Sequence, residues 1–234
     1  MTLSEQAAGY IDFLEQWIAT LPTLSLPRVL QEPAKCAVMC VDLINGFCTA
    51  GPLSSPRVQA IVPPITRLFR SAYDQGVRDF ILPQDTHDPD AVEFASYPPH
   101  CVRGNPESQT VPELAALPFA GEFVIIEKNS ISSAQNTALD NWLDQHARIS
   151  TFIVTGDCSD LCTHQLAMHL RLRANARQTP GVRVIVPADC VQTYDTPIEA
   201  ADRLGIPPHH GDLLHAIFLH NMSINGVEVV GSLK

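Results

Sequence analysis

Three side chains that could together perform covalent catalysis each follow a separate short apolar run, directly or, for the third, after an intervening turn. They are a carboxylate, an amine and a thiol: Asp42, Lys128 and Cys162. The runs that precede them are residues 36–41, 123–126 and 152–154. A thiol attacks carbonyl carbon once a neighbouring base has taken its proton, and an amine can hold the negative charge that develops. The three residue types therefore indicate a cysteine nucleophile with its base and its cation.

Each of these residues also has a structural explanation. A free cysteine is most often a small buried apolar residue, and Asp42 with Lys128 could form an ordinary ion pair at a sheet edge. Cys162 precedes a helical pattern, where the helix dipole and free N–H groups would favour a thiolate. A carboxylate, an amine and a thiol that each follow a different strand favour the catalytic interpretation.

A second set of polar residues lies in the segment 84–112, which has no helical or strand periodicity. Its candidate metal ligands are Asp85, His87, Glu93 and His100. Carboxylate and imidazole groups suit Zn²⁺, Mn²⁺ or Fe²⁺, and alternation along an extended chain points Asp85 and His87 to one side. The alternatives are solvated side chains, a turn-capping role for His100, and Cys101 as a rival ligand.

The elements that must position these groups alternate between strand and helix. Buried strands are expected at 36–41, 77–82, 123–127, 151–155, 182–187 and 227–230. Helices are expected at 4–19, 63–75, 136–146, 162–175, 197–204 and 211–220. This order predicts a three-layer α/β/α sandwich with a doubly wound, mostly parallel sheet of about six strands. Ligands bind in such folds outside the carboxyl ends of the strands, where the candidate residues lie.

The first 33 residues read as an addition to this domain. A helix over 4–19 with Ser4 as its cap is followed by a proline-containing linker, so residues 1–33 are predicted to be a helical extension and residues 34–234 the domain. The extension has an apolar stripe at Ala7, Ile11, Leu14 and Ile18. Such a stripe packs on the domain or on a neighbouring subunit, and we expect a homo-oligomer.

Charge and composition argue against some classes of binding partner and indicate the cell compartment. The formal net charge of −10 argues against nucleic acid or an anionic membrane as the main partner, and no apolar stretch has the length of a membrane helix. The N-terminus has no secretion-signal pattern, and seven irregularly spaced cysteines favour a reducing cytoplasm.

Two suggestive patterns carry less weight. Cys158 and Cys162 are four positions apart, which is not the spacing of a thioredoxin-type pair. The late histidines are expected on a solvated or core helix face and not at a second metal site: His209, His210, His215 and His220.

Four segments together resemble one family. Residues 36–47 read Cys-Ala-Val-Met-Cys-Val-Asp-Leu-Ile-Asn-Gly-Phe, Glu127-Lys128 ends a strand, and residues 156–162 read Gly-Asp-Cys-Ser-Asp-Leu-Cys. The fourth segment runs from Asp85-Thr-His87 through Glu93-Phe94 to Tyr97-Pro-Pro-His100-Cys-Val-x-Gly104. Over about residues 34–195 the chain resembles the isochorismatase-like cysteine hydrolases, and within them the nicotinamidase (pyrazinamidase) branch.

The resemblance implies roles for these residues. Asp42, Lys128 and Cys162 would form the catalytic triad, and the backbone N–H groups of Cys158 and Cys162 would form the oxyanion hole. A non-proline cis peptide would join Asp157 to Cys158. The implied reaction is hydrolysis of a small amide, nicotinamide to nicotinate and ammonia, through a thioester on Cys162.

The same resemblance implies a metal beside the triad. Asp85, His87 and His100, with Glu93 in some members, would hold a divalent ion that binds the pyridine nitrogen. Zinc is the first candidate, with manganese or iron as alternatives, and Phe47 would flank the substrate ring.

Three departures from the family pattern bear on the substrate. Ile44 and Gly46 replace polar residues, Thr163-His164 follows the nucleophile where a small apolar residue is usual, and the N-terminal helix is added. One alternative is a hydrolase of another small amide or ureido acid within the superfamily. Others from different classes are a non-catalytic metal-binding or interaction domain and a redox thiol protein with a Cys158–Cys162 disulfide.

Overall fold

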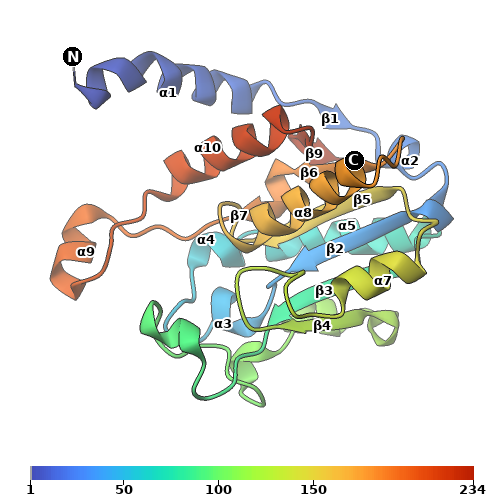
Figure 1. The fold of residues 1–234 in the computed structure, drawn as a ribbon, viewed down its shortest axis with the longest axis horizontal. Coiled ribbons are helices and arrows are strands. Elements are labelled where there is room, and N and C mark those ends of the chain that lie inside the picture. Colours follow the sequence, from blue (N-terminus) through green and yellow to red (C-terminus); the bar gives the residue numbers. More distant parts are fainter. Residues whose placement is uncertain (1) are drawn as a thin grey trace.

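A parallel sheet organises the chain in the computed structural model, which describes residues 2–234 (Figure 1). Its strands are β2 (Cys36–Val41), β3 (Asp79–Asp85), β4 (Val124–Lys128), β5 (Thr151–Asp157), β6 (Arg183–Pro187), β7 (Val191–Gln192) and β8 (Glu228–Val230). Their order is β4-β3-β2-β5-β6-β8, with β7 beside the end of β5, and every pairing is parallel. The chain runs outward from β2 to β4 and then returns to β5 on the other side of β2. Beyond the ends of β2 and β5 lies the topological switch point, where such sheets bind ligands.

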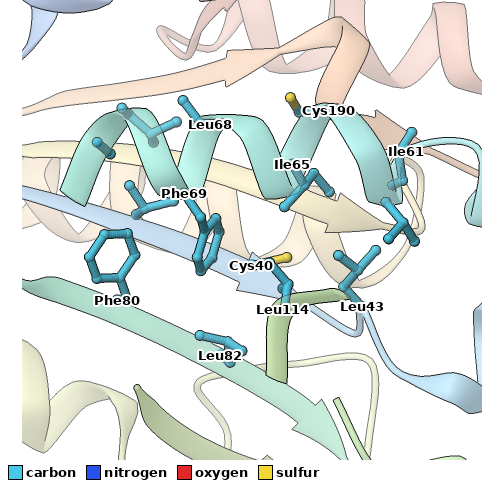
Figure 2. Close-up of a cluster of buried hydrophobic side chains, with 14 of the residues drawn as sticks. Cys40, Leu43, Ile61, Ile65, Leu68, Phe69, Phe80, Leu82, Leu114 and Cys190 are labelled. Carbon is cyan, nitrogen blue, oxygen red and sulfur yellow. The ribbon is translucent and has the colours of Figure 1, made fainter. Parts of the chain in front are cut away.

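Helices cover both faces of this sheet, which confirms the α/β/α sandwich. One face is covered by α5 (Val62–Asp74), and the other by α7 (Leu139–Gln145), α8 (Cys162–Ala176) and α10 (Gly211–Ile224). Phe69 of α5 packs against Phe80 of β3 and lies in one cluster with Cys40 of β2 (Figure 2). Because successive side chains of β2 point to opposite faces, Met39 joins the cluster under α8 instead. All six residues of β2 are buried, as their continuous apolar run predicts.

Further helices, 3-10 turns and a small second sheet complete the fold. The remaining helices are α1 (Leu3–Ala19), α2 (Leu26–Val29), α3 (Asn45–Cys48), α4 (Pro56–Gln59), α6 (Pro112–Ala115) and α9 (Ile198–Leu204). Single 3-10 turns are η1 (Pro33–Lys35), η2 (Val92–Ala95), η3 (Pro106–Ser108), η4 (Ala120–Glu122) and η5 (Ala188–Cys190). A two-stranded parallel sheet pairs β1 (Thr23–Leu24) with β9 (Ser232–Leu233). In Figure 1, α9 projects from one end of the molecule, away from the sheet.

Two expectations about local structure are wrong. The cap of α1 is Thr2 and not Ser4, because Thr2 accepts the N–H of Glu5 while Glu5 accepts the N–H of Thr2. The strand expected at 77–82 continues to Asp85, since Gln84 and Asp85 pair with Glu127 and Lys128 of β4. Tertiary pairing thus extends β3 past its apolar run and carries Asp85 on a rigid strand.

The N-terminal extension packs on the C-terminal part of the domain. Trp17 and Phe13 of α1 lie edge-on to the ring of His220 on α10, with ring centroids 5.2 and 5.3 Å apart. Leu14 is the buried member of the predicted apolar stripe. The expected linker is structured as β1, α2 and η1. The division of the chain at residue 33 remains a prediction.

Candidate active site

The predicted triad meets beyond the carboxyl ends of the strands. Asp42 follows β2, Lys128 ends β4, and Cys162 begins α8. The ligand atoms of Asp42, Asp85 and Cys162 all lie within 4.8 Å of one another. All four side chains are buried, and Asp42 is fully enclosed. The parallel topology thus brings together four groups from distant parts of the chain.

Lys128 is the centre of this cluster. Its Nζ lies 2.7 Å from Oδ2 of Asp42, 2.5 Å from Oδ1 of Asp85 and 3.5 Å from Sγ of Cys162. It also donates to the carbonyl oxygen of Ser130 at 3.1 Å. One buried cation therefore pairs with two carboxylates and faces the thiol, an arrangement that an isolated ion pair at a sheet edge does not have.

Asp42 is held in an unusual backbone conformation. Its φ of 56° lies in the left-handed region, which aspartate tolerates better than most residues. Its N–H donates to the carbonyl of Pro83 at 2.9 Å, and its Oδ1 accepts the N–H of Asp85 at 2.8 Å. Both bonds attach Asp42 to β3. Its carboxylate is therefore fixed between Lys128 and Cys162.

Burial sets the protonation of the cluster. Burial, and then the charge of Asp85, raises the pKa of Asp42 to about 6, although Lys128 opposes the shift. Burial would also raise the pKa of Asp85, but Lys128 and the two histidines hold it below its usual range. For Lys128, burial would lower the pKa, but Asp42 and Asp85 raise it well above the usual value, so the amine stays charged.

The surroundings of Cys162 favour its thiol form. Burial raises the pKa of Cys162 well above its usual value, and Lys128 opposes this shift while Asp42 and Asp85 add to it. Burial and the two carboxylates thus oppose the thiolate that the start of α8 and the cation are expected to favour. A base must remove the proton, and the Asp42 carboxylate lies within reach.

The loop that carries Cys162, residues 156–162, has the cis peptide bond that the resemblance implied. The peptide bond from Asp157 to Cys158 is cis. Gly156 has a φ of 110°, and a Cβ at this position would overlap the carbonyl oxygen of Val41 on β2. Among the hydrogen bonds of the described residues, the backbone N–H groups of Cys158 and Cys162 have no acceptor. These N–H groups are free to bind an anion.

Three of the four predicted metal ligands form a compact group. The ligand atoms of Asp85, His87 and His100 lie within 4.8 Å of one another, and all three residues are buried. Nε2 of His87 and Nε2 of His100 lie 3.7 and 3.8 Å from Oδ2 of Asp85. Both ring nitrogens of His87 are buried without a hydrogen-bond partner in residues 2–234. A divalent ion would satisfy that orphaned imidazole, so these residues fit a metal site.

The chain is similar in sequence to known hydrolases. The model of the isochorismatase domain family matches residues 36–205. The chain belongs to this family. Nicotinamidase 1 of Arabidopsis thaliana is 29% identical over 226 residues, which cover 89% of this chain and 90% of that protein. N-carbamoylsarcosine amidase of an Arthrobacter species is 29% identical over 164 residues, covering 66% of this chain and 58% of that protein.

Solved structures agree with the fold. The pyrazinamidase of Pyrococcus horikoshii, solved in complex with zinc, superposes with a TM-score of 0.61 at 22% identity and covers 84% of this chain and 98% of that one. At this identity the likeness supports the fold alone. The family match and the similarity to nicotinamidase show that this chain is an amide-bond hydrolase of the isochorismatase family. Its relatives act on more than one amide, so membership does not fix the substrate.

Aromatic rings surround the proposed metal ligands of this family member. Phe47 is 9% exposed, and its ring centroid lies 5.8 Å from that of His100. Phe94 lies 5.6 Å from His100 and 5.3 Å from His87, and Tyr97 lies 6.2 Å from His100. Phe47 was predicted as a substrate contact. Phe94 and Tyr97 belonged to a motif of the resemblance, but no role was predicted for either. Their place in the loop beside Glu93 was the signal that could have marked them.

Glu93, and the residues Ile44, Thr163 and His164 that depart from the family pattern, lie outside the compact group of metal ligands. Glu93 is half-buried outside the compact ligand group, and burial followed by the charge of Asp85 raises its pKa. Thr163 is fully buried, and Nε2 of His164 lies 3.1 Å from Oδ1 of Asn221 on α10. His164 therefore packs against α10 and not beside Asp42. Ile44 is also fully buried.

No second metal group involves the late histidines in residues 2–234. Nor is any helix there long and apolar enough to cross a membrane. His209 and His215 instead contact the loop 156–162, which the sequence interpretation missed because the partners are 49 and 56 positions apart.

Proposed function

We propose that the protein deamidates nicotinamide to nicotinate and ammonia through a thioester on Cys162. The observation that carries the proposal is the position of Asp85, which contacts Lys128 through one oxygen and faces His87 and His100 through the other. A cysteine site and a metal-ligand group thereby share one side chain. A metal held by these residues would offer a binding point for a pyridine nitrogen, which would favour a pyridine carboxamide over an amide without such a ring nitrogen.

Asp42 is proposed as the general base. Its pKa of about 6 leaves it ionised at neutral pH yet basic enough to accept a proton, which is the range that suits general-base catalysis. In the proposed step, the thiol proton of Cys162 moves to the Asp42 carboxylate as Sγ attacks the carboxamide carbon. The proton then passes to the leaving nitrogen, which departs as ammonia, and water hydrolyses the thioester.

Lys128 and the free N–H groups are proposed to stabilise charge. Lys128 lies near the thiol and Asp42, so its cation offsets the negative charge as the proton moves between them. The N–H groups of Cys158 and Cys162 would hold the oxyanion of each tetrahedral intermediate. Removal of one such donor in other enzymes lowers turnover about 100-fold or more.

Asp85, His87 and His100 are the proposed ligands of a divalent ion, with Glu93 as a further candidate nearby. Zinc is the first candidate, with manganese and iron as alternatives. When bound, the ion would supply a Lewis acid for the substrate's ring nitrogen and for a bound water. Phe47 is proposed to lie against the ring, which its position beside His100 supports.

The direct test is ammonia release from nicotinamide by purified protein after chelation, with and without added Zn²⁺, Mn²⁺ or Fe²⁺. Metal-dependent release supports the proposal, and Cys162→Ala should abolish it. Metal-loaded protein that leaves nicotinamide intact but hydrolyses N-carbamoylsarcosine or another small ureido acid would support the alternative substrate class. Metal content after His87→Ala/His100→Ala separates the two parts of the site.

Assembly and location remain predictions. The exposed apolar residues of α1 would suit the predicted homo-oligomer: Leu3, Tyr10, Ile11 and Phe13. Light scattering coupled to size-exclusion chromatography measures the assembly. Cell fractionation tests the cytoplasmic location.

A further inference from the structure

Two consecutive residues of the loop 156–162 are each bonded to a histidine from the C-terminal part of the chain. Oδ2 of Asp160 lies 2.7 Å from Nε2 of His209, and Oγ of Ser159 lies 2.9 Å from Nδ1 of His215. Both loop side chains are buried. The proposed reaction uses neither histidine, so their contacts require a separate explanation.

His209 is also fixed on its other side. Its Nδ1 lies 3.0 Å from the carbonyl oxygen of Tyr194, its ring stacks on that of Tyr194 at 3.8 Å, and its backbone exchanges hydrogen bonds with Thr196. Because a carbonyl oxygen can only accept, Nδ1 carries a proton and donates it. The 2.7 Å contact between Nε2 and the Asp160 carboxyl is a second hydrogen bond, so both ring nitrogens of His209 are engaged.

Asp160 depends on this one contact. Its other oxygen, Oδ1, is buried with no partner in the described part of the chain, so His209 is the hydrogen-bond partner of the carboxyl group there. Leaving a buried carboxylate unpaired is costly. Cys158 and Cys162, whose N–H groups are free, stand two positions before and two positions after Asp160 in the same loop, so loss of His209 would leave a buried carboxyl unpaired between them.

We propose that His209 is a positioning residue for the oxyanion hole. By satisfying Asp160, it keeps the two N–H groups free and their loop fixed for the anion that forms during the reaction. This inference rests on the proposed role of Cys162 as nucleophile. Because the oxyanion develops in the transition state, loss of His209 should lower kcat far more than it changes KM.

The chain offers a matched control for this role. His169 on α8 forms a similar pair with Asp140, 2.9 Å between Nε2 and Oδ1, but both residues are partly exposed and outside the site. His209→Gln and His169→Gln therefore each replace a histidine paired with aspartate. In Asp160→Asn/His209→Gln the carboxylate that would compete for the oxyanion hole is also gone.

The experiment compares kcat and KM for nicotinamide, and the rate of Cys162 alkylation by iodoacetamide, in the zinc-loaded full-length proteins. For His209→Gln we expect kcat to fall about tenfold or more, with KM and the alkylation rate within about threefold of wild type. His169→Gln should match wild type, and the double variant should recover kcat to within about threefold of wild type.

A wild-type kcat in His209→Gln, or a double variant as impaired as His209→Gln, would overturn the positioning role. If His209→Gln does not fold, the double variant is compared with wild type alone. A kcat more than about tenfold below wild type in the double variant would then overturn the positioning role. Absence of turnover in the wild-type protein contradicts the proposed function instead, and so the two failures can be told apart.

Discussion

Asp85 and Lys128 join the two parts of the site through one ion pair, with Nζ 2.5 Å from Oδ1. The two residues are also direct partners in the register of β3 and β4. The sheet itself thus places the proposed metal ligand against the cation that faces the thiol. A change at either residue should affect stability, metal binding and turnover together.

Lys128→Met should strongly destabilise the protein. The change leaves Asp42 and Asp85 buried without their cation, and we expect a loss of about 3 kcal/mol or more in the free energy of unfolding. Urea denaturation at pH 7 measures it. Arg183→Met is the control, because the Arg183–Glu228 pair is about 40% exposed and its loss should cost under about 1 kcal/mol. Equal losses in the two variants would contradict the central role of Lys128.

His87→Ala/His100→Ala should lose bound zinc while keeping the fold. The two imidazoles supply two of the three ligands in the compact group, and the remaining carboxylate cannot hold the ion alone. Metal analysis after dialysis, with circular dichroism as the check on folding, measures both quantities. Wild-type zinc content in the double variant would exclude this site. His169→Ala, which removes a partly exposed histidine outside the group, should retain the metal.

The titration of His215 should lower the free energy of unfolding as the pH falls from 7 to 5. Burial, followed by the charge of Arg57, lowers its pKa to about 4, whereas an unfolded histidine titrates near 6.5. Between these values the unfolded chain binds more protons, so stability rises with pH across the window and falls on acidification.

The comparison with His215→Gln isolates this contribution. From pH 7 to pH 5 the wild type should lose about 1 to 2 kcal/mol more than the variant, a range that allows for the partial exposure of the ring. Urea melts at several pH values give the difference. Parallel curves for the two proteins would show that His215 does not titrate in this way.

Gly156→Ala should prevent correct packing of the loop onto β2. A Cβ there overlaps the carbonyl oxygen of Val41, and the neighbouring backbone of β2 is buried in the centre of the sheet and cannot move away. We expect a loss of about 3 kcal/mol or more, or insoluble protein. Gly181→Ala, which also has a positive φ but open space around it, should cost only about 1 kcal/mol. Thermal melting of both variants distinguishes steric overlap from backbone conformation.

The sequence was sufficient for the layers and for the convergence of the triad, because both follow from local patterns. Continuous apolar runs identified β2 and β5 as buried strands, and parallel topology then required Asp42, Lys128 and Cys162 to meet at one edge. The metal ligands were proposed from residue types in the segment 84–112 and from the resemblance, whereas the cis peptide came from the resemblance alone. Asp85 was predicted only as a metal ligand. Its contact with Lys128 depends on the register of β3 and β4, which the apolar runs do not set.

Other features depend on contacts that no local pattern encodes. The bond from His209 to Asp160 spans 49 positions. His209 and His210 were expected on a helix face, whereas both precede the first residue of α10. The cap at Thr2 depended on a reciprocal bond with Glu5, while Ser4 was equally suitable by residue type. The thiol state of Cys162 depends on how completely the site is enclosed. Such features require the packed structure.

If Cys162 is the nucleophile, it forms a covalent acyl intermediate with nicotinamide during turnover. The most direct measurement is mass spectrometry of metal-loaded protein that is mixed with nicotinamide and quenched in acid during turnover. We predict that the peptide containing Cys162 gains the mass of one nicotinoyl group, and that Cys162→Ala shows neither the adduct nor ammonia release. Full ammonia release by Cys162→Ala, or an adduct on another residue, would exclude Cys162 as the nucleophile.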